Sequence, residues 1–203
     1  MRSTFKNVTK NNAHAVLKGC AEDLAVTNIS MGKDFDNPFL TVLFEDGQLA
    51  SSVIIGDTAG VREKMVQICA TTFALAVEQK ILAVAFVFEG WESRQSSDEN
   101  EEYVPPSLSE NRVDIVGVQT ISIDTDEDTF VTWVKDETKD AANKLTNREC
   151  RTFDNSSGTF SGFKPLYLEM LNRKNNVDDE IKNIAKIHAE ALLHYVDAPK
   201  HHS

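Results

Sequence analysis

The segment Glu89–Arg94 holds the side chains of this sequence that are best suited to contact another molecule. Trp91 stands between the carboxylates Glu89 and Glu92, and the guanidinium group of Arg94 follows. The segment comes directly after a long apolar run, so we expect it to leave the end of a strand and enter a loop, where binding residues are often found. We predict these four residues as a partner-binding site. The competing interpretation is that Trp91 covers the sheet edge while the charged groups face water.

Catalytic chemistry has no motif in this sequence. The patterns HExxH, CxxC, GxSxG and GxGxxG, which mark common hydrolase, redox and dinucleotide sites, do not occur. Asp124, Asp126 and Asp128 alternate as in a calcium loop, but Thr129 and Lys135 stand where that loop needs glycine and glutamate. We therefore predict no catalytic residue, no metal site and no cofactor, and we favour a protein that is not an enzyme.

Two other functions stay open. One is a divergent metal-dependent enzyme that uses carboxylates such as Glu89 and Asp114; calorimetric titration with magnesium, manganese and calcium tests it. The other is a homo-oligomeric structural protein that pairs through an exposed strand edge or through its C-terminal helix, which light scattering tests.

Nearly all of the excess negative charge lies in one stretch of the chain. The formal net charge is −11, and residues 89–128 alone hold 12 acidic and 2 basic side chains. Nucleic-acid binding needs clustered Lys and Arg, so we expect no direct contact with DNA or RNA. Residues 92–111 are rich in Ser, Glu and Asp and contain a Pro-Pro pair. This composition predicts a long acidic loop that is either a functional flap or disordered.

The cysteines and the apolar runs indicate where the protein is found. Cys20, Cys69 and Cys150 are an odd number of widely spaced thiols, which is typical of reduced cysteines in a cytosol. The longest apolar run, Ile81–Phe88, has eight residues, against about 20 for a membrane span. The basic N-terminus has no apolar core after it, so we expect no secretory signal. We predict a cytoplasmic protein without membrane contact.

The spacing of apolar residues predicts the elements that position these groups. We expect a helix over 12–25, strands over 39–44 and 49–55, a helix from Thr58 to Val77, and strands over 81–88, 113–123 and 129–134. Asp46-Gly47 predicts a tight hairpin turn between the first two strands. The run Ile81–Phe88 is apolar on both sides of its pleat, so we place it in the interior of a sheet.

The C-terminal third gives a weaker signal. Residues 136–149 are interpreted as a short polar helix, and residues 150–165, which contain three phenylalanines, as a hairpin or an aromatic-anchored loop. A last helix begins at Asp178 with an acidic first turn. The residues predicted to form its apolar face are Val177, Ile181, Ile184, His188, Ala191, Leu192 and Tyr195.

Together these elements predict an α+β fold. We expect an antiparallel or mixed sheet of about five strands, with helices packed mainly on one face and a C-terminal helix. Residues 1–203 are expected to form a single domain, in which 92–111 is the acidic loop and 136–203 a candidate helical subregion. The predicted function is a non-catalytic cytosolic interaction module that binds a protein partner through the acidic loop and the Trp91 region. Self-association is the other partner prediction.

Overall fold

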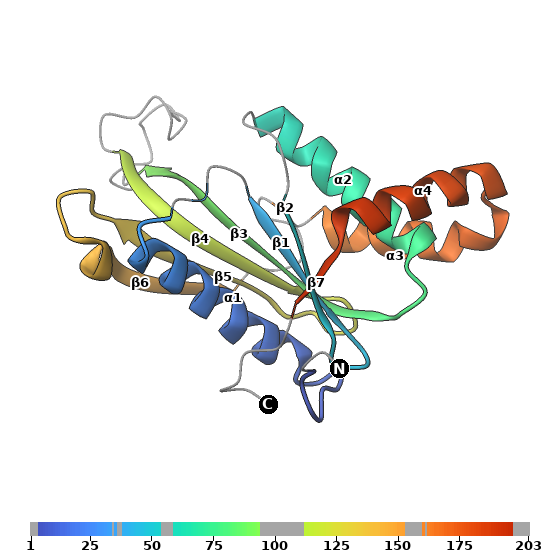
Figure 1. Cartoon of the computed structure of the whole chain (residues 1–203), viewed down its shortest axis with the longest axis horizontal. Helices are drawn as coiled ribbons and strands as arrows, with labels where there is room; N and C mark the ends of the chain where they lie inside the picture. The colour runs from blue at the N-terminus through green and yellow to red at the C-terminus, as the bar shows by residue number, and fades with distance from the viewer. Residues whose placement is uncertain are drawn as a thin grey trace, which may run out of the picture.

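A computed structural model of the chain shows an antiparallel β-sheet with helices on both faces (Figure 1). The structure describes residues 4–33, 35, 38–53, 59–93, 112–152, 160 and 162–196. Seven strands pair in the order β6-β5-β4-β3-β1-β2-β7, and every paired neighbour is antiparallel. The predicted α+β class is confirmed, with two more strands than expected.

The elements follow one another along the chain in a simple order. They are α1 (Ala13–Ser30), β1 (Phe39–Phe44), β2 (Leu49–Val53), α2 (Ala59–Ala76), β3 (Ile81–Ser93), β4 (Arg112–Ser122), β5 (Asp128–Lys135), the short 3-10 helix η2 (Ala141–Asn143), β6 (Leu145–Thr152), α3 (Phe163–Arg173), the 3-10 turn η3 (Lys174–Asn176), α4 (Asp179–Leu192) and β7 (His194–Val196). In the described residues no helix is both long and apolar enough to cross a membrane.

β3 is the interior strand that its sequence predicts. It pairs with β1 on one side and with β4 on the other, and every residue from Ile81 to Phe88 is buried. The strand continues to Ser93, five residues beyond the apolar run. The longer strand is possible because β4 begins at Arg112 and pairs with β3 along its whole length.

The hairpin between β1 and β2 turns at Gly47, as the Asp-Gly pair predicts. Gly47 has a φ of +77°, a conformation that glycine adopts at no steric cost. The Asp46 carboxylate accepts a hydrogen bond from the Gln48 amide at 3.0 Å. A Cβ atom at position 47 would collide with the Phe5 carbonyl oxygen, so the turn also needs glycine for space.

In the described residues, α1 is the helix that covers one face of the sheet. Leu17, Ala21 and Ile29 of this helix are buried against strand residues such as Ala85 and Val118. The prediction that helices lie mainly on one face therefore holds for α2, α3 and α4, whereas α1 packs on the opposite face. Coverage on both sides explains why β3 is apolar on both sides of its pleat.

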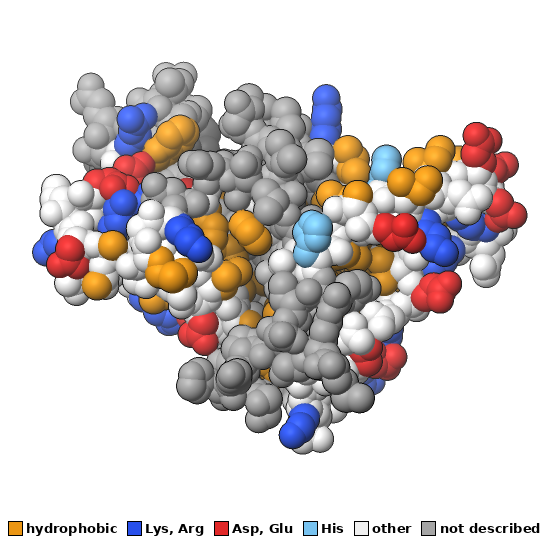
Figure 2. All heavy atoms as spheres, in the orientation of Figure 1, with side chains coloured by type: hydrophobic (Ala, Val, Ile, Leu, Met, Phe, Trp, Pro, Cys, Tyr) orange, Lys and Arg blue, Asp and Glu red, His pale blue; other side chains and the backbone are white. Residues whose placement is uncertain are grey.

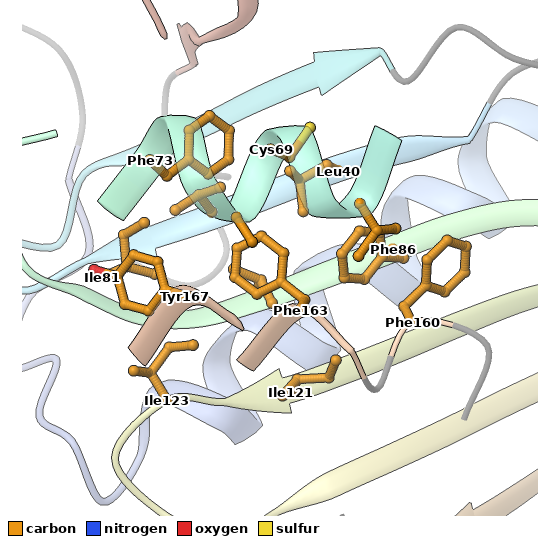
Figure 3. Packing of buried hydrophobic residues seen from close by; sticks show 14 of the residues in the cluster. Leu40, Cys69, Phe73, Ile81, Phe86, Ile121, Ile123, Phe160, Phe163 and Tyr167 are labelled. Atoms are coloured by element: carbon orange, nitrogen blue, oxygen red, sulfur yellow. The ribbon is translucent and has the colours of Figure 1, made fainter. Parts of the chain in front are cut away.

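The other face carries the larger aromatic cluster (Figure 3). Phe86 of β3 stacks on Phe160 with ring centroids 4.2 Å apart and meets the edge of Phe163 at 5.8 Å. Phe163 in turn contacts Phe73 of α2 and stacks on Tyr167. The phenylalanines at 160 and 163, which the sequence leaves in a hairpin or loop, anchor the start of α3 in this core.

The prediction of a polar helix over residues 136–149 is wrong. These residues form a turn, the 3-10 helix η2 and the first half of β6. β6 is an edge strand whose residues from Asn147 to Thr152 are exposed. A strand that buries neither side lacks the apolar alternation on which the sequence prediction depends. The edge strand β7 is also absent from the prediction, because three residues are too short to show a period.

The last helix begins where the sequence predicts, but the side that it buries differs from the predicted apolar face. The Asp178 carboxylate caps α4 by accepting a hydrogen bond from the Glu180 amide at 2.7 Å. The residues that α4 buries are Ala185 and Ala189. Ile181 and Ile184, predicted to lie in the core, are 52% and 49% exposed. Ala185 and Ala189 face inward where α4 lies against α2, and Leu192 at the end of the helix packs, partly buried, against the core cluster.

Candidate interaction site

The predicted site lies within a strand and is divided between the two faces of the sheet. Glu89, Trp91 and Glu92 belong to β3 instead of leaving it for a loop. Side chains alternate along a strand, so Glu89 and Trp91 point to the α1 face and Glu92 points to the other. Arg94 and the predicted loop from residue 94 to residue 111 lie outside the described residues. The three described residues of the predicted site therefore do not converge on one cluster.

Glu89 is held by two groups of the protein itself. Its Oε1 atom accepts a hydrogen bond from the Phe35 amide at 2.7 Å, and its Oε2 atom accepts one from Lys135 Nζ at 2.6 Å. Lys135 is the less accessible partner, with 7% of its side chain exposed against 22% for Glu89. The Glu89 carboxylate therefore neutralises a nearly buried ammonium group and fixes the approach to β1.

A chain of alternating charges continues from Lys135 to the turn before β6. Glu137 accepts from Lys135 Nζ at 3.0 Å and from Lys144 Nζ at 2.6 Å. These hydrogen bonds, that from Lys144 first, lower the pKa of Glu137. Because each charge has an opposite neighbour, this cluster is a network that fastens β5 to β3 and to the turn. It offers little free charge to a ligand.

Trp91 is the residue of the predicted site that presents a large apolar surface. Half of it, 51%, is exposed. The guanidinium carbon of Arg112 lies 5.4 Å from the centre of the Trp91 ring, within the range of a cation–π contact. Arg112 pairs with Ser93 and Asp114 pairs with Trp91 in the β3–β4 register, so the three side chains share one face. Trp and Arg are both enriched in protein–protein contacts and among the residues that dominate binding.

Glu92 serves a different cluster on the opposite face. Its carboxylate accepts a hydrogen bond from Arg151 at 2.7 Å, and Glu149 of β6 accepts another from the same guanidinium at 2.9 Å. These two carboxylates, Glu149 first, raise the pKa of Arg151. Arg151 is half exposed, so the pair contributes little to stability. Its geometry nevertheless links the far end of β3 to the edge strand.

The acidic turn between β4 and β5 is also neutralised in part. Lys80 Nζ lies 2.7 Å from the Asp124 carboxylate and Lys164 Nζ lies 3.6 Å from that of Asp126. The antiparallel register pairs Ala83 with Ser122 and Ser93 with Arg112. This turn and the far end of β3 are therefore at opposite ends of the β3–β4 pair. The two acidic runs do not form one charged patch in the described structure.

Asp128 and Gln119 form a buried polar pair beneath α3. Gln119 donates from Nε2 to both Asp128 oxygens, at 3.1 and 3.0 Å, and its Oε1 accepts from the Phe160 amide at 3.1 Å. Burial raises the pKa of the Asp128 carboxyl. Both polar atoms of the Gln119 amide group and both Asp128 oxygens have a hydrogen-bond partner, so this pair fixes the chain entering α3.

The three cysteines differ in their surroundings. Burial raises the pKa of the Cys20 and Cys69 thiols to about 11, which leaves them protonated at neutral pH. Cys150 is exposed on β6, where Lys18 Nζ lies 3.5 Å from its Sγ atom. Its two flanking arginines are engaged with carboxylates: Arg148 with Glu22 and Arg151 with Glu92 and Glu149.

The described residues give no support to the alternative of a metal-dependent enzyme that uses Glu89 and Asp114. Glu89 and Asp114 share the α1 face, since Trp91 pairs with Asp114 and Glu89 lies two residues before Trp91. Both oxygens of Glu89 are already hydrogen-bonded. In the part of the chain that the structure describes, no group of three or more His, Cys, Asp or Glu side chains is placed to hold a metal ion.

Two residues of this region escape prediction from sequence. Arg112 and Lys135 lie 18 or more positions from the nearest predicted site residue, and only the pairing of β3, β4 and β5 brings them close. Arg112 directly precedes the apolar strand residues of β4, as the charged residues of the predicted site directly follow those of β3. An antiparallel pairing of the two predicted strands implies this neighbourhood.

Comparison with known proteins gives no relative. No protein-family model, no curated protein sequence and no solved structure matches this chain.

Proposed function

We propose that the protein is a non-catalytic interaction module that binds a protein partner through the surface around Trp91. The observation that carries the proposal is the contrast within one strand. Glu89 is fully occupied by the Phe35 amide and Lys135, whereas half of the Trp91 side chain remains exposed beside Arg112.

The energetics of the two side chains support this choice. A carboxylate that already neutralises a nearly buried lysine would lose that contact on binding a ligand, and breaking a buried pair is costly. An exposed tryptophan gains free energy from burial at roughly 25 cal/mol per Å² of apolar surface. Its ring is also restrained by the Arg112 guanidinium, so less side-chain freedom is lost when a partner covers it.

Affinity capture from a cell extract tests the proposal. The tagged wild-type chain, the Trp91→Ala variant and the control Glu169→Ala/Arg173→Ala are compared by quantitative mass spectrometry. The control removes an exposed ion pair of α3, on a helix that lies on the other face of the sheet. We expect proteins retained by the wild type and the control to be lost from Trp91→Ala.

Two results would count against the proposal. An identical set of captured proteins on all three baits would show that Trp91 contacts none of them. Turnover of a substrate by a purified chain that loses activity in Glu89→Gln but not in Trp91→Ala would favour the enzyme alternative. Circular dichroism of each variant verifies that the fold is retained.

A further inference from the structure

α4 carries an apolar strip on the side that faces away from the sheet. Ile181, Ile184 and Ile187 are 52%, 49% and 65% exposed. The helix buries Ala185 and Ala189 on its inner side. Figure 2 shows hydrophobic side chains gathered along α4 with a histidine among them and acidic side chains at the far end of the helix. An apolar strip of this kind on a folded protein commonly marks an interaction surface.

Two residues of this strip, Ile184 and Ile187, lie on a line of exposed residues that has the spacing of a helix–helix seam. Glu180, Ile184, Ile187 and Ala191 follow one another at intervals of four, three and four residues, and all are exposed. This alternation of three and four keeps side chains along one line of a helix, and it is the spacing through which paired helices contact each other. Three of these four side chains are apolar, and the fourth is the carboxylate of Glu180.

The strip also places a carboxylate and an imidazole of one copy against those of a second copy of the same helix. If two α4 helices meet antiparallel with Ile184 at the two-fold axis, Ile181 of each lies beside Ile187 of the other. The same register places Glu180 of each copy beside His188 of the other, twice across the axis.

We propose that the protein forms a two-fold symmetric homodimer through the exposed strip of α4, with Ile184 at the axis. The dimer is independent of the Trp91 surface. α4 packs on α2, on the three-helix face of the sheet that α2, α3 and α4 cover (Figure 1). Trp91 points to the opposite, α1 face and lies at the far end of β3. Each copy would keep its Trp91 surface exposed, and the dimer would offer two of them to a partner.

Sedimentation velocity over a range of about 1 to 100 µM, which spans weak to moderate affinities, tests the dimer. We expect the wild-type chain to convert from monomer to dimer with rising concentration. Ile184→Ser/Ile187→Ser should weaken the dimer by at least about tenfold, since centrally buried apolar residues dominate such contacts. Val26→Ser is the matched control, because Val26 is 43% exposed on α1, across the sheet, and should leave the dimer unchanged.

A charge exchange tests the register. Glu180→Lys removes the attraction to His188 and His188→Glu places two carboxylates together, so each single variant should weaken the dimer. The double variant Glu180→Lys/His188→Glu should restore it to within about twofold of the wild type, because the opposite charges again face each other across the axis. Within one chain these residues are two turns apart, so a restored dimer reports contact between copies.

Three results would overturn the proposal. A wild-type chain that stays monomeric over the whole range excludes the dimer. A dimer that is insensitive to Ile184→Ser/Ile187→Ser, or as sensitive to Val26→Ser, uses another surface. A double charge variant that is weaker than both single variants contradicts the antiparallel register. None of these outcomes bears on capture of partners by the Trp91 surface, so the two proposals fail separately.

Discussion

At the far end of β3 and on the outer side of α4, the side chains have roles different from those that their residue types suggest. The carboxylates of β3 resemble a site, yet Glu89 and Glu92 are engaged with Lys135 and Arg151. The isoleucines of α4 resemble a core, yet Ile184 is half exposed. Availability for an external contact therefore depends on what the rest of the fold places opposite a side chain. Chemical type alone does not reveal it.

The largest predicted effect compares two isoleucines. Ile121 of β4 is 2% exposed in the three-helix core, whereas Ile184 is 49% exposed. Ile121→Ala should lower the free energy of unfolding by about 3 kcal/mol, the usual loss for a buried isoleucine. Ile184→Ala should lower that of the dilute monomer by less than about 1 kcal/mol. Urea unfolding at low protein concentration measures both, and equal losses would mean that α4 buries Ile184.

The second prediction concerns Glu89. Glu89→Gln removes one carboxylate partner of the Lys135 ammonium group, which has 7% of its side chain exposed, while Glu137 still contacts it. We expect a loss of about 1–2 kcal/mol in the free energy of unfolding, less than for a fully buried pair because Glu89 is partly exposed. Glu92→Gln, whose partner Arg151 is half exposed, should cost less than about 1 kcal/mol. A larger loss in Glu92→Gln than in Glu89→Gln would reverse the assignment of roles.

Local sequence patterns were sufficient to predict two features of the fold. The interior position of β3 and the hairpin at Gly47 follow from local patterns, because burial on both faces and a tight turn each constrain neighbouring residues. The ion pair of Glu89 with Lys135 joins strands that are not adjacent, since β4 lies between β3 and β5. No local pattern encodes such a contact.

The buried side of α4 could not be predicted from sequence. Its apolar arc is wider than the part that α2 covers, and periodicity cannot tell which side of a broad arc is buried. The small residues Ala185 and Ala189 face inward, because they allow α4 to approach α2 closely. The sequence prediction placed Ile181, Ile184 and Leu192 on one apolar face. Leu192 packs against the core cluster, whereas the two isoleucines are about half exposed. β6 was missed for a related reason, since an exposed edge strand has no apolar alternation.

The third prediction uses pH at the contact between α1 and the β4–β5 hairpin. Burial lowers the pKa of His14 below 6.5, and its Nε2 atom lies 3.1 Å from the Thr120 carbonyl oxygen and 3.2 Å from Thr129 Oγ1. A group with a lowered folded-state pKa contributes stability above its unfolded pKa that is lost as the pH falls. The urea midpoint should therefore decrease from about pH 7.5 to about pH 5.5, and His14→Gln should reduce that decrease. An unchanged decrease in the variant would assign it to other groups.

The smallest predicted effect on stability is that of Trp91→Ala. The ring is 51% exposed and its contact with Arg112 is a surface cation–π pair, which contributes about 0.5–1 kcal/mol. We expect the free energy of unfolding to fall by about 1 kcal/mol or less, while intrinsic fluorescence shifts towards that of Trp133, which is 6% exposed. A loss of several kcal/mol would instead make Trp91 a structural residue that covers the sheet edge.

Cross-linking of single cysteines tests whether the outer side of α4 is a contact surface between two copies of the chain. In a Cys150→Ser background, Cys20 and Cys69 are buried with raised pKa values and react slowly, so a short bis-maleimide reports only an introduced thiol. Ile184→Cys should give a covalent dimer at micromolar protein concentration, while Val26→Cys, on the opposite face, should stay monomeric. Equal cross-linking at the two positions, or none at position 184, would contradict the account.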